Sequence, residues 1–230
     1  MSATPVESIK IPLADESSVS GLLQVPAKAR AGYVLAHGAG AGMTHPFIAA
    51  IAAGLAARSI ATLRYQFLYM EKFSRWPDAP KVAHAAVRAA VSEAARRLPH
   101  LPWFAGGKSF GGRMTSQAQA ASPMAGVHGL VLLGFPLHPA GKPSSERAQH
   151  LFDFDLPLLF LQGTNDQLAD VSLLEPLIGK LGERATLKLF AEADHSFHVP
   201  KRSGRTDAEV RDDLLDTMAG WMGKVGRIRG

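Results

Sequence analysis

The segment WFAGGKSFGGRM, residues 103–114, constrains the fold of this chain more than any other stretch. The apolar residues at its start suit a buried strand, and the apolar spacing from Gly111 onward is typical of a helix. Ser109 falls in the turn between them, with Gly107 two residues before it and Gly111 two residues after it. Glycines at these positions remove the Cβ atoms that would clash in so tight a turn. The pattern therefore predicts a nucleophile elbow with Ser109 at its tip.

Such a turn holds its serine beyond the carboxyl edge of the sheet, where the hydroxyl can reach a substrate. The next backbone N–H, that of Phe110, lies at the start of the helix and can stabilise a negatively charged oxygen. The alternative is a glycine-rich turn whose serine only caps the helix. Residues that can activate Ser109 decide between these two interpretations.

The rest of the chain alternates between short apolar runs and helical patterns. Two partly alternating runs, residues 8–13 and 21–26, indicate an antiparallel hairpin at a sheet edge. The order predicts a single-domain α/β fold, with a mostly parallel sheet, an antiparallel N-terminal edge and helices on both faces. We expect one domain, residues 1–230, in which about 224–230 form a flexible basic tail. Further strands are expected at residues 32–37, 59–65, 103–108, 129–135, 156–162 and 185–190, and helices at residues 46–58, 81–98, 111–121, 171–181 and 206–222.

Composition removes several classes of function. The chain has no cysteine, which excludes a cysteine nucleophile, a thiolate metal site and a disulfide framework. No apolar run is long enough to cross a bilayer and residues 1–7 do not resemble a signal peptide, so we expect a cytoplasmic protein without a membrane partner. The formal charge of +5 arises mostly from basic residues scattered among acidic ones, so we expect no nucleic-acid partner.

A serine hydroxyl needs a base within hydrogen-bond reach and a carboxylate that orients this base. In hydrolases with this kind of turn, the acid and then the histidine follow the serine along the chain. Only His195 and His198 lie after the strand that is expected to carry the acid. We favour His195 because it follows the last strand more closely and is better fixed, and His198 is the alternative. The chain order excludes His37, His45, His84, His100, His128, His138 and His150.

Asp166 ends the sequence GTND, which directly follows the apolar run at residues 156–162. Asp170 lies nearer the next helix, so Asp166 is the favoured acid. The competing interpretation is a turn or helix-capping aspartate, a common use of this residue at such junctions. Ser109, Asp166 and His195 each follow a different predicted strand, so we expect them to meet at the carboxyl edge of the sheet.

The glycine-rich segment HGAGAG, residues 37–42, follows an early strand. Its glycines allow the backbone to approach a substrate carbonyl closely. We expect the second oxyanion donor to be the N–H of Ala39, with Gly40 as the alternative, and we expect His37 to stabilise the loop. A phosphate-binding loop is the competing interpretation, but the segment matches neither the dinucleotide-binding pattern nor the P-loop pattern.

From about residue 33 to residue 221 the chain resembles an α/β-hydrolase, most closely the dienelactone-hydrolase-related branch. The motifs HGAG, GGKSFGGR and DHSFHVPK are similar to those of bacterial hydrolases grouped with the testis-expressed and NSL-complex-subunit proteins. The resemblance implies a serine hydrolase with a triad of Ser109, Asp166 and His195. No large lid insertion follows Phe135, so we expect a shallow and fairly open site. Dienelactone hydrolases use a cysteine nucleophile, which this chain lacks, so that specific activity is not implied.

Two features beside the elbow are compatible with more than one role. Lys108 directly precedes Ser109, and if it is buried it requires a carboxylate partner. We expect a structural ion pair with Glu71 or Glu192. The second feature is an aromatic segment that contains Phe67, Tyr69, Met70 and Phe73. These residues either line an acyl pocket or simply pack in the core.

These features together predict a serine hydrolase that cleaves a carboxylic ester or thioester of a small to medium acyl group through an acyl-enzyme on Ser109. We expect no cofactor, no metal, and a small-molecule ester as the partner. Activity should fall at acid pH, because a protonated imidazole cannot act as a base. The alternative is a catalytically silent α/β-hydrolase fold that serves as a protein-interaction module. The sequence does not determine the acyl and alcohol preference or the oligomeric state.

Overall fold

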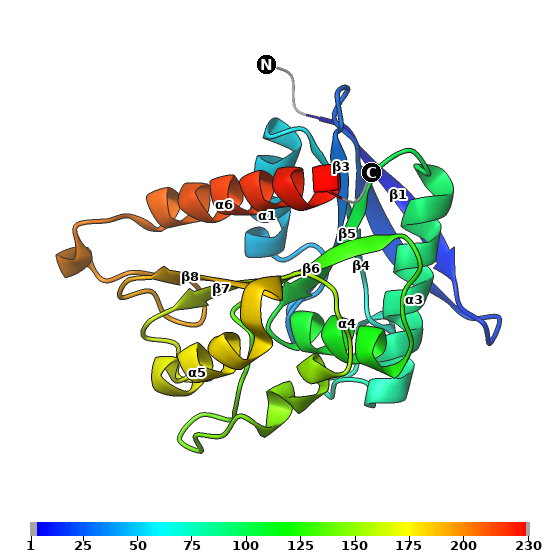
Figure 1. Cartoon of the computed structure of the whole chain (residues 1–230). Helices are drawn as coiled ribbons and strands as arrows, with labels where there is room; N and C mark the ends of the chain where they lie inside the picture. The colour runs from blue at the N-terminus through cyan, green and yellow to red at the C-terminus, as the bar shows by residue number, and fades with distance from the viewer. Residues whose placement is uncertain (1–3, 229–230) are drawn as a thin grey trace.

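One mixed sheet organises the chain, whose computed structural model describes residues 4–228 (Figure 1). Within these residues the strands are β1 (Val6–Pro12), β2 (Ser18–Gln24), β3 (Ala31–Ala36), β4 (Ile60–Tyr65), β5 (Trp103–Lys108), β6 (Val127–Leu133), β7 (Leu158–Gly163) and β8 (Ala185–Phe190). Their order in the sheet is β1-β2-β4-β3-β5-β6-β7-β8. β2 is antiparallel to both β1 and β4, and all other neighbours are parallel. The predicted mostly parallel sheet with an antiparallel N-terminal edge is confirmed.

The burial of each strand follows from its place in the sheet. β3, β4 and β7 are buried along their whole length, as expected for apolar strands that are covered on both faces. β1 lies at the edge, and in its second half exposed and buried residues alternate, because only one of its faces meets the core. The hairpin between β1 and β2 turns at Asp15, whose carboxylate accepts hydrogen bonds from the backbone and hydroxyl of Ser17.

Helices cover both faces of the sheet, as predicted (Figure 1). They are α1 (Pro46–Ala57), α2 (Leu68–Glu71), α3 (Pro80–Arg97), α4 (Phe110–Ala121), α5 (Val171–Leu181) and α6 (Asp207–Ile228). On one face, α1 and α6 bury Leu55 and Leu215 in the same apolar cluster. On the other face, α3, α4 and α5 contribute Val87, Met114 and Leu174 to a second cluster. The sheet therefore lies between two helical layers, and each layer has its own core.

Two segments differ from the sequence prediction. The long connection after β4 contains the short helix α2, which its mixed aromatic sequence did not indicate. The last helix, α6, continues to Ile228 instead of ending at residue 222, so this part of the predicted flexible tail is helical. In this extension Gly226 packs against Pro102, where a Cβ would lie 3.4 Å from the proline ring. Residues 229–230 of the predicted tail lie outside the described residues.

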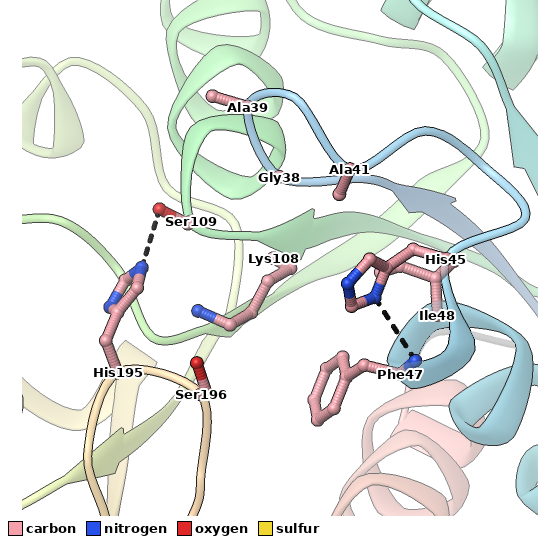
Figure 2. A pocket seen from close by; sticks show the side chains of 10 residues that line it. All are labelled: Gly38, Ala39, Ala41, His45, Phe47, Ile48, Lys108, Ser109, His195 and Ser196. Carbon is pink, nitrogen blue, oxygen red and sulfur yellow. Dashed lines mark hydrogen bonds between the residues drawn. The ribbon is translucent and has the colours of Figure 1, made fainter.

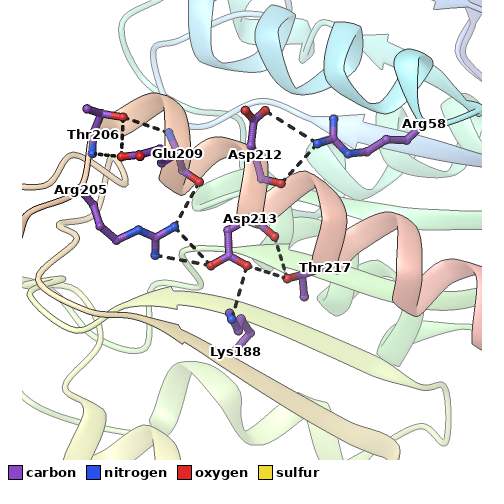
Figure 3. A network of polar contacts seen from close by, with 8 residues as sticks. All are labelled: Arg58, Lys188, Arg205, Thr206, Glu209, Asp212, Asp213 and Thr217. Atoms are coloured by element: carbon purple, nitrogen blue, oxygen red, sulfur yellow. Dashed lines mark hydrogen bonds and ion pairs between the residues drawn. The ribbon is translucent and has the colours of Figure 1, made fainter.

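Polar contacts anchor the first half of α6 (Figure 3). Thr206 precedes the helix and forms a capping box with Glu209. The Thr206 Oγ1 accepts a hydrogen bond from the Glu209 N–H at 3.2 Å, and the Glu209 carboxylate accepts one from the Thr206 N–H at 2.7 Å. Asp213 lies 3.4 Å from Lys188 of β8, which joins the helix to the edge of the sheet. These contacts fix the segment that directly follows the last loop of the sheet.

The parallel strands place several loops on one edge of the molecule. Because β3 to β8 run in the same direction, the loops that follow β3, β4, β5, β7 and β8 all start at the carboxyl edge of the sheet. The predicted site residues belong to these loops. Within residues 4–228, no helix has the length and apolar character that crossing a membrane requires.

Candidate active site

Ser109 occupies a strained turn between β5 and α4. Its backbone has φ 50° and ψ −115°, a conformation that residues with a side chain rarely adopt. Both flanking glycines are required by close packing, since a Cβ on Gly107 would lie 2.3 Å from the carbonyl oxygen of Ala36 and a Cβ on Gly111 would lie 2.6 Å from that of His37. The geometry is that of a nucleophile elbow, and it turns the hydroxyl away from the helix, where it makes no capping hydrogen bond.

His195 joins this serine to a buried carboxylate. Its Nε2 lies 2.9 Å from Ser109 Oγ (Figure 2), and its Nδ1 lies 2.7 Å from Asp166 Oδ2. An ionised carboxylate can only accept, so Nδ1 carries the proton and Nε2 is left to accept the serine proton. The Asp166 side chain has no exposed surface, and it also accepts from Gln162 and from the backbone N–H of Leu168. The arrangement orients the imidazole in the tautomer that a general base requires.

The alternatives considered from the sequence lie elsewhere. His198 is exposed and pairs with Asp207 at 2.9 Å, a contact that raises the pKa of the imidazole. Asp170 caps α5, since its carboxylate accepts from the backbone and hydroxyl of Ser172, and these hydrogen bonds lower its pKa. Of the candidates, the structure brings only Asp166 and His195 together with Ser109.

Two backbone donors lie beside Ser109. Phe110 is the first residue of α4, and the N–H groups of a first helical turn have no acceptor within the helix. Ala39 lies in the loop after β3 and lines the same hollow as Ser109. The alternative donor, the N–H of Gly40, already donates to the hydroxyl of Tyr69 at 2.8 Å. The geometry thus favours Ala39 over Gly40 as the second oxyanion donor.

His37 ties this loop to the following connection. The residue is fully buried, its Nδ1 lies 2.7 Å from the Gly38 carbonyl oxygen, and its Nε2 accepts from the backbone N–H of Phe67. Burial lowers the pKa of the imidazole to about 4, so the ring is neutral at physiological pH. Its contacts are those of a residue that holds the Ala39 loop in place.

The hollow beside Ser109 and His195 has a volume of about 240 Å³. Figure 2 shows the loop of Ala39 and Ala41 on one side and Phe47 on the other. α1 supplies Phe47 and Ile48 to its wall, and Phe47 stacks on Phe197 at 6.0 Å between ring centroids. Sequence reasoning did not identify this apolar wall, although the position of Phe47 and Ile48 at the start of the helix after the glycine-rich loop could have suggested it. The remaining lining residues are Gly38, His45, Lys108 and Ser196.

Of the two interpretations of the aromatic segment, the acyl pocket is not formed. Phe67 and Tyr69 are buried and pack edge to face against Phe110, so they belong to the core below the site. Phe73 is 95% exposed and does not line the hollow beside Ser109. The interpretation as simple packing therefore holds for Phe67 and Tyr69, and for Met70, which is partly buried against the same core, whereas Phe73 has neither role.

Lys108 lacks the ion pair that the sequence suggested. Glu71 accepts from the backbone of Ser20, and Glu192 pairs with Arg202 at 3.0 Å. The Lys108 amine is buried, has no hydrogen-bond partner among the described residues, and lies 5.8 Å from the centre of the Phe197 ring. Figure 2 shows the amine turned toward His195 and Ser196.

The Lys108 amine is only partly compensated by more distant charges. Burial lowers its pKa to about 8, and the charges of Asp166 and Asp194 oppose this shift without reversing it. A partly deprotonated amine therefore lies beside the imidazole at physiological pH.

Among residues 4–228 no group of histidine, aspartate and glutamate side chains is arranged to hold a metal ion.

Comparisons of the sequence and of the fold with known proteins identify relatives of this chain. The sequence model of the family described as "Alpha/beta hydrolase domain" matches residues 29–223. The fold is similar to that of a dienelactone hydrolase from Anabaena variabilis, with 18% identity, a TM-score of 0.78, and coverage of 97% of this chain and 99% of that one. A serine hydrolase without a lid from Xanthomonas campestris has 18% identity, a TM-score of 0.73 and 94% coverage of both chains. A cold-adapted esterase from an Arctic intertidal metagenomic library has 18% identity, a TM-score of 0.66, and coverage of 96% of this chain and 95% of that one.

Proposed function

The chain belongs to the α/β-hydrolase domain family, as its sequence suggested, and we propose that it is a serine hydrolase that cleaves a carboxylic ester through an acyl-enzyme on Ser109. One observation carries the proposal: Ser109, His195 and Asp166 form a continuous hydrogen-bonded chain of 2.9 Å and 2.7 Å. The neighbouring esterase and serine hydrolase structures support a hydrolytic reaction.

In the proposed acylation step, Ser109 Oγ attacks the substrate carbonyl carbon while His195 Nε2 takes its proton. Asp166 stabilises the imidazolium that forms, because its carboxylate is buried against Nδ1. The N–H groups of Phe110 and Ala39 receive the carbonyl oxygen as it gains negative charge. The C–O bond to the alcohol then breaks, and His195 returns the proton to the leaving oxygen.

Deacylation follows the same steps, with water in place of Ser109 as the nucleophile and Ser109 Oγ as the leaving group. His195 takes a proton from water, the water oxygen attacks the acyl carbon, and the bond to Ser109 Oγ breaks with return of the proton to the serine. The acid product leaves, and the enzyme is restored. Every proton transfer uses the same imidazole, so the proposed cycle needs neither a cofactor nor a metal.

The hollow favours a small to medium acyl group. Its volume of about 240 Å³ is below the range of about 300–1,000 Å³ that is typical of drug-sized ligand pockets. Phe47 and Ile48 give it an apolar wall. A thioester presents the same carbonyl carbon to Ser109, so thioesters belong to the proposed substrate class.

A panel of p-nitrophenyl esters of graded acyl length tests the substrate class. We expect kcat/KM to peak at short or medium acyl groups and to fall for long ones, because a long chain cannot be buried in this hollow. A steady rise toward the longest chains would contradict the proposed size limit.

A fluorophosphonate probe separates the enzyme from the silent interaction module. Wild type should be labelled, Ser109→Ala should not, and Ser196→Ala should be labelled like wild type. Ser196 is the matched control because it lines the same hollow but its side chain is not hydrogen-bonded to His195 or Asp166. Absence of labelling in wild type would favour the interaction module.

A further inference from the structure

A turn that follows α2 holds two aromatic rings in solvent. This aromatic turn, residues 72–76, has the sequence KFSRW. Phe73 is 95% exposed and Trp76 is 83% exposed, far more than any other large apolar side chain among the described residues. Exposure of two large rings within four residues is unfavourable in water, so the pair indicates a surface that is covered in function.

Hydrogen bonds fix the aromatic turn. The Ser74 N–H donates to the carbonyl oxygen of Tyr69 at 2.8 Å, and the Trp76 N–H donates to Ser74 Oγ at 3.1 Å. Phe73 has a φ of 53°, a left-handed conformation that is uncommon for a bulky residue. The backbone therefore presents the two rings to solvent in a defined conformation.

Exposed charges around the rings are mainly basic. Lys72, Arg75 and Lys81 are exposed, and none of them forms an ion pair within the described part of the chain. The two acidic groups of this connection are engaged by backbone, since Glu71 accepts from Ser20 and Asp78 accepts from Tyr69 at 3.0 Å. Asp15, in the turn between β1 and β2, interacts electrostatically with Lys72. The aromatic turn is thus amphipathic, because basic side chains alternate along the sequence with the exposed rings of Phe73 and Trp76.

The aromatic turn lies on the same edge of the sheet as the site. It belongs to the loop after β4, and the site residues follow β5, β7 and β8, which run parallel to β4 in the sheet. The segment that leads into it packs against the glycine-rich loop, since the Tyr69 hydroxyl accepts from Gly40 and a Cβ on Gly42 would lie 3.4 Å from Met70. A partner that covered the aromatic turn would therefore contact the protein at the carboxyl edge of the sheet, where the candidate site also lies.

We propose that the aromatic turn docks the protein on an anionic lipid surface, with Phe73 and Trp76 inserted at the headgroup boundary and Lys72, Arg75 and Lys81 facing the negative charge. Aromatic rings flanked by lysine and arginine have the chemistry that favours such an interface. A second copy of the chain is a poorer occupant, because a two-fold interface would set these cations against themselves. The sequence-based expectation of no membrane partner considered only spanning and signal segments, and surface docking needs neither.

Vesicle sedimentation tests the proposal. Wild type should bind phosphatidylcholine vesicles that contain phosphatidylserine and should bind much less to phosphatidylcholine alone. Phe73→Ser with Trp76→Ser should weaken binding by at least about tenfold, given the apolar area that two rings bury. Phe152→Ser, a control that removes a ring exposed by 42% on the connection between β6 and β7, should bind like wild type. No binding of wild type, or equal loss in the control, would overturn the proposal.

Tryptophan fluorescence identifies the contact directly. Trp103 is buried and Trp221 packs against Phe104, so a brominated lipid should quench Trp76 alone, and Trp76→Phe should bind vesicles while losing the quenching. Quenching that persists in Trp76→Phe would overturn the proposal, as would a dimer that dissociates in the double variant. Hydrolysis of a soluble short-chain ester should be unchanged in these variants, so loss of docking and loss of the proposed catalysis are distinguishable.

Discussion

Replacement of Lys108 by methionine should stabilise the protein, although the residue adjoins the proposed nucleophile. Methionine keeps the length and flexibility of the side chain and removes the amine. The amine is buried, has no hydrogen-bond partner among residues 4–228, and is reached by the charges of Asp166 and Asp194 only at longer range. Its ammonium form is therefore more costly in the folded chain than in water.

The pKa gives the size and pH dependence of this effect. Burial lowers the pKa of Lys108 from 10.5 to about 8 in the folded protein, which corresponds to about 3 kcal/mol of destabilisation when the amine is charged in both states. Below about pH 8 this destabilisation is fully present. Between about pH 8 and pH 10.5 the unfolded chain binds the proton that the folded chain has lost, so the free energy of unfolding rises with pH and the destabilisation disappears.

Urea unfolding of wild type and Lys108→Met at several pH values between neutral and about 10 measures the prediction. The variant should gain up to about 3 kcal/mol at neutral pH, and the gain should shrink as the pH rises. Lys180→Met, which removes an exposed lysine from α5, should show neither effect. A gain that does not change with pH, or a loss of stability at neutral pH, would refute the reasoning that the amine is uncompensated.

Other substitutions test separate parts of the structure. Asp166→Asn should lower kcat on the order of 10²- to 10⁴-fold with little change in KM, because an amide cannot hold the required imidazole tautomer; an unchanged kcat would contradict its proposed role. His198→Ala should leave ester hydrolysis unchanged in the same assay. Thr206→Ala should lower the free energy of unfolding by about 1 kcal/mol through loss of the capping box, as measured in urea. Gly107→Ala should lower it by more than about 3 kcal/mol, since its Cβ would lie 2.3 Å from the Ala36 oxygen, and normal stability would contradict this account of the turn.

Much of the fold and the candidate site could be predicted from local sequence. Each of the residues Ser109, Asp166 and His195 follows an apolar run that ends in a turn, and parallel strands bring such turns to one edge whatever the details of packing. The chain order of the three residues then removed seven of the nine histidines from consideration. The sheet and its two helical layers followed from the same alternation of strands and helices.

Features that depend on packing between distant segments were not predictable. The sequence shows Lys108 but not that Glu71 and Glu192 have other partners, so the expected ion pair was wrong. It shows Phe73 but not that its backbone turns the ring into solvent. The extension of α6 to Ile228 passes through Gly223 and Gly226, and the low helix propensity of glycine did not indicate a helix there.

The rate at which a fluorophosphonate modifies Ser109, with the adduct located by peptide mass spectrometry, tests most directly whether His195 activates this hydroxyl. Wild type should carry a single adduct on the peptide that contains Ser109, and His195→Ala should be modified at least about 100-fold more slowly. Equal rates in the two proteins, or an adduct on a different residue, would contradict the proposed chemistry.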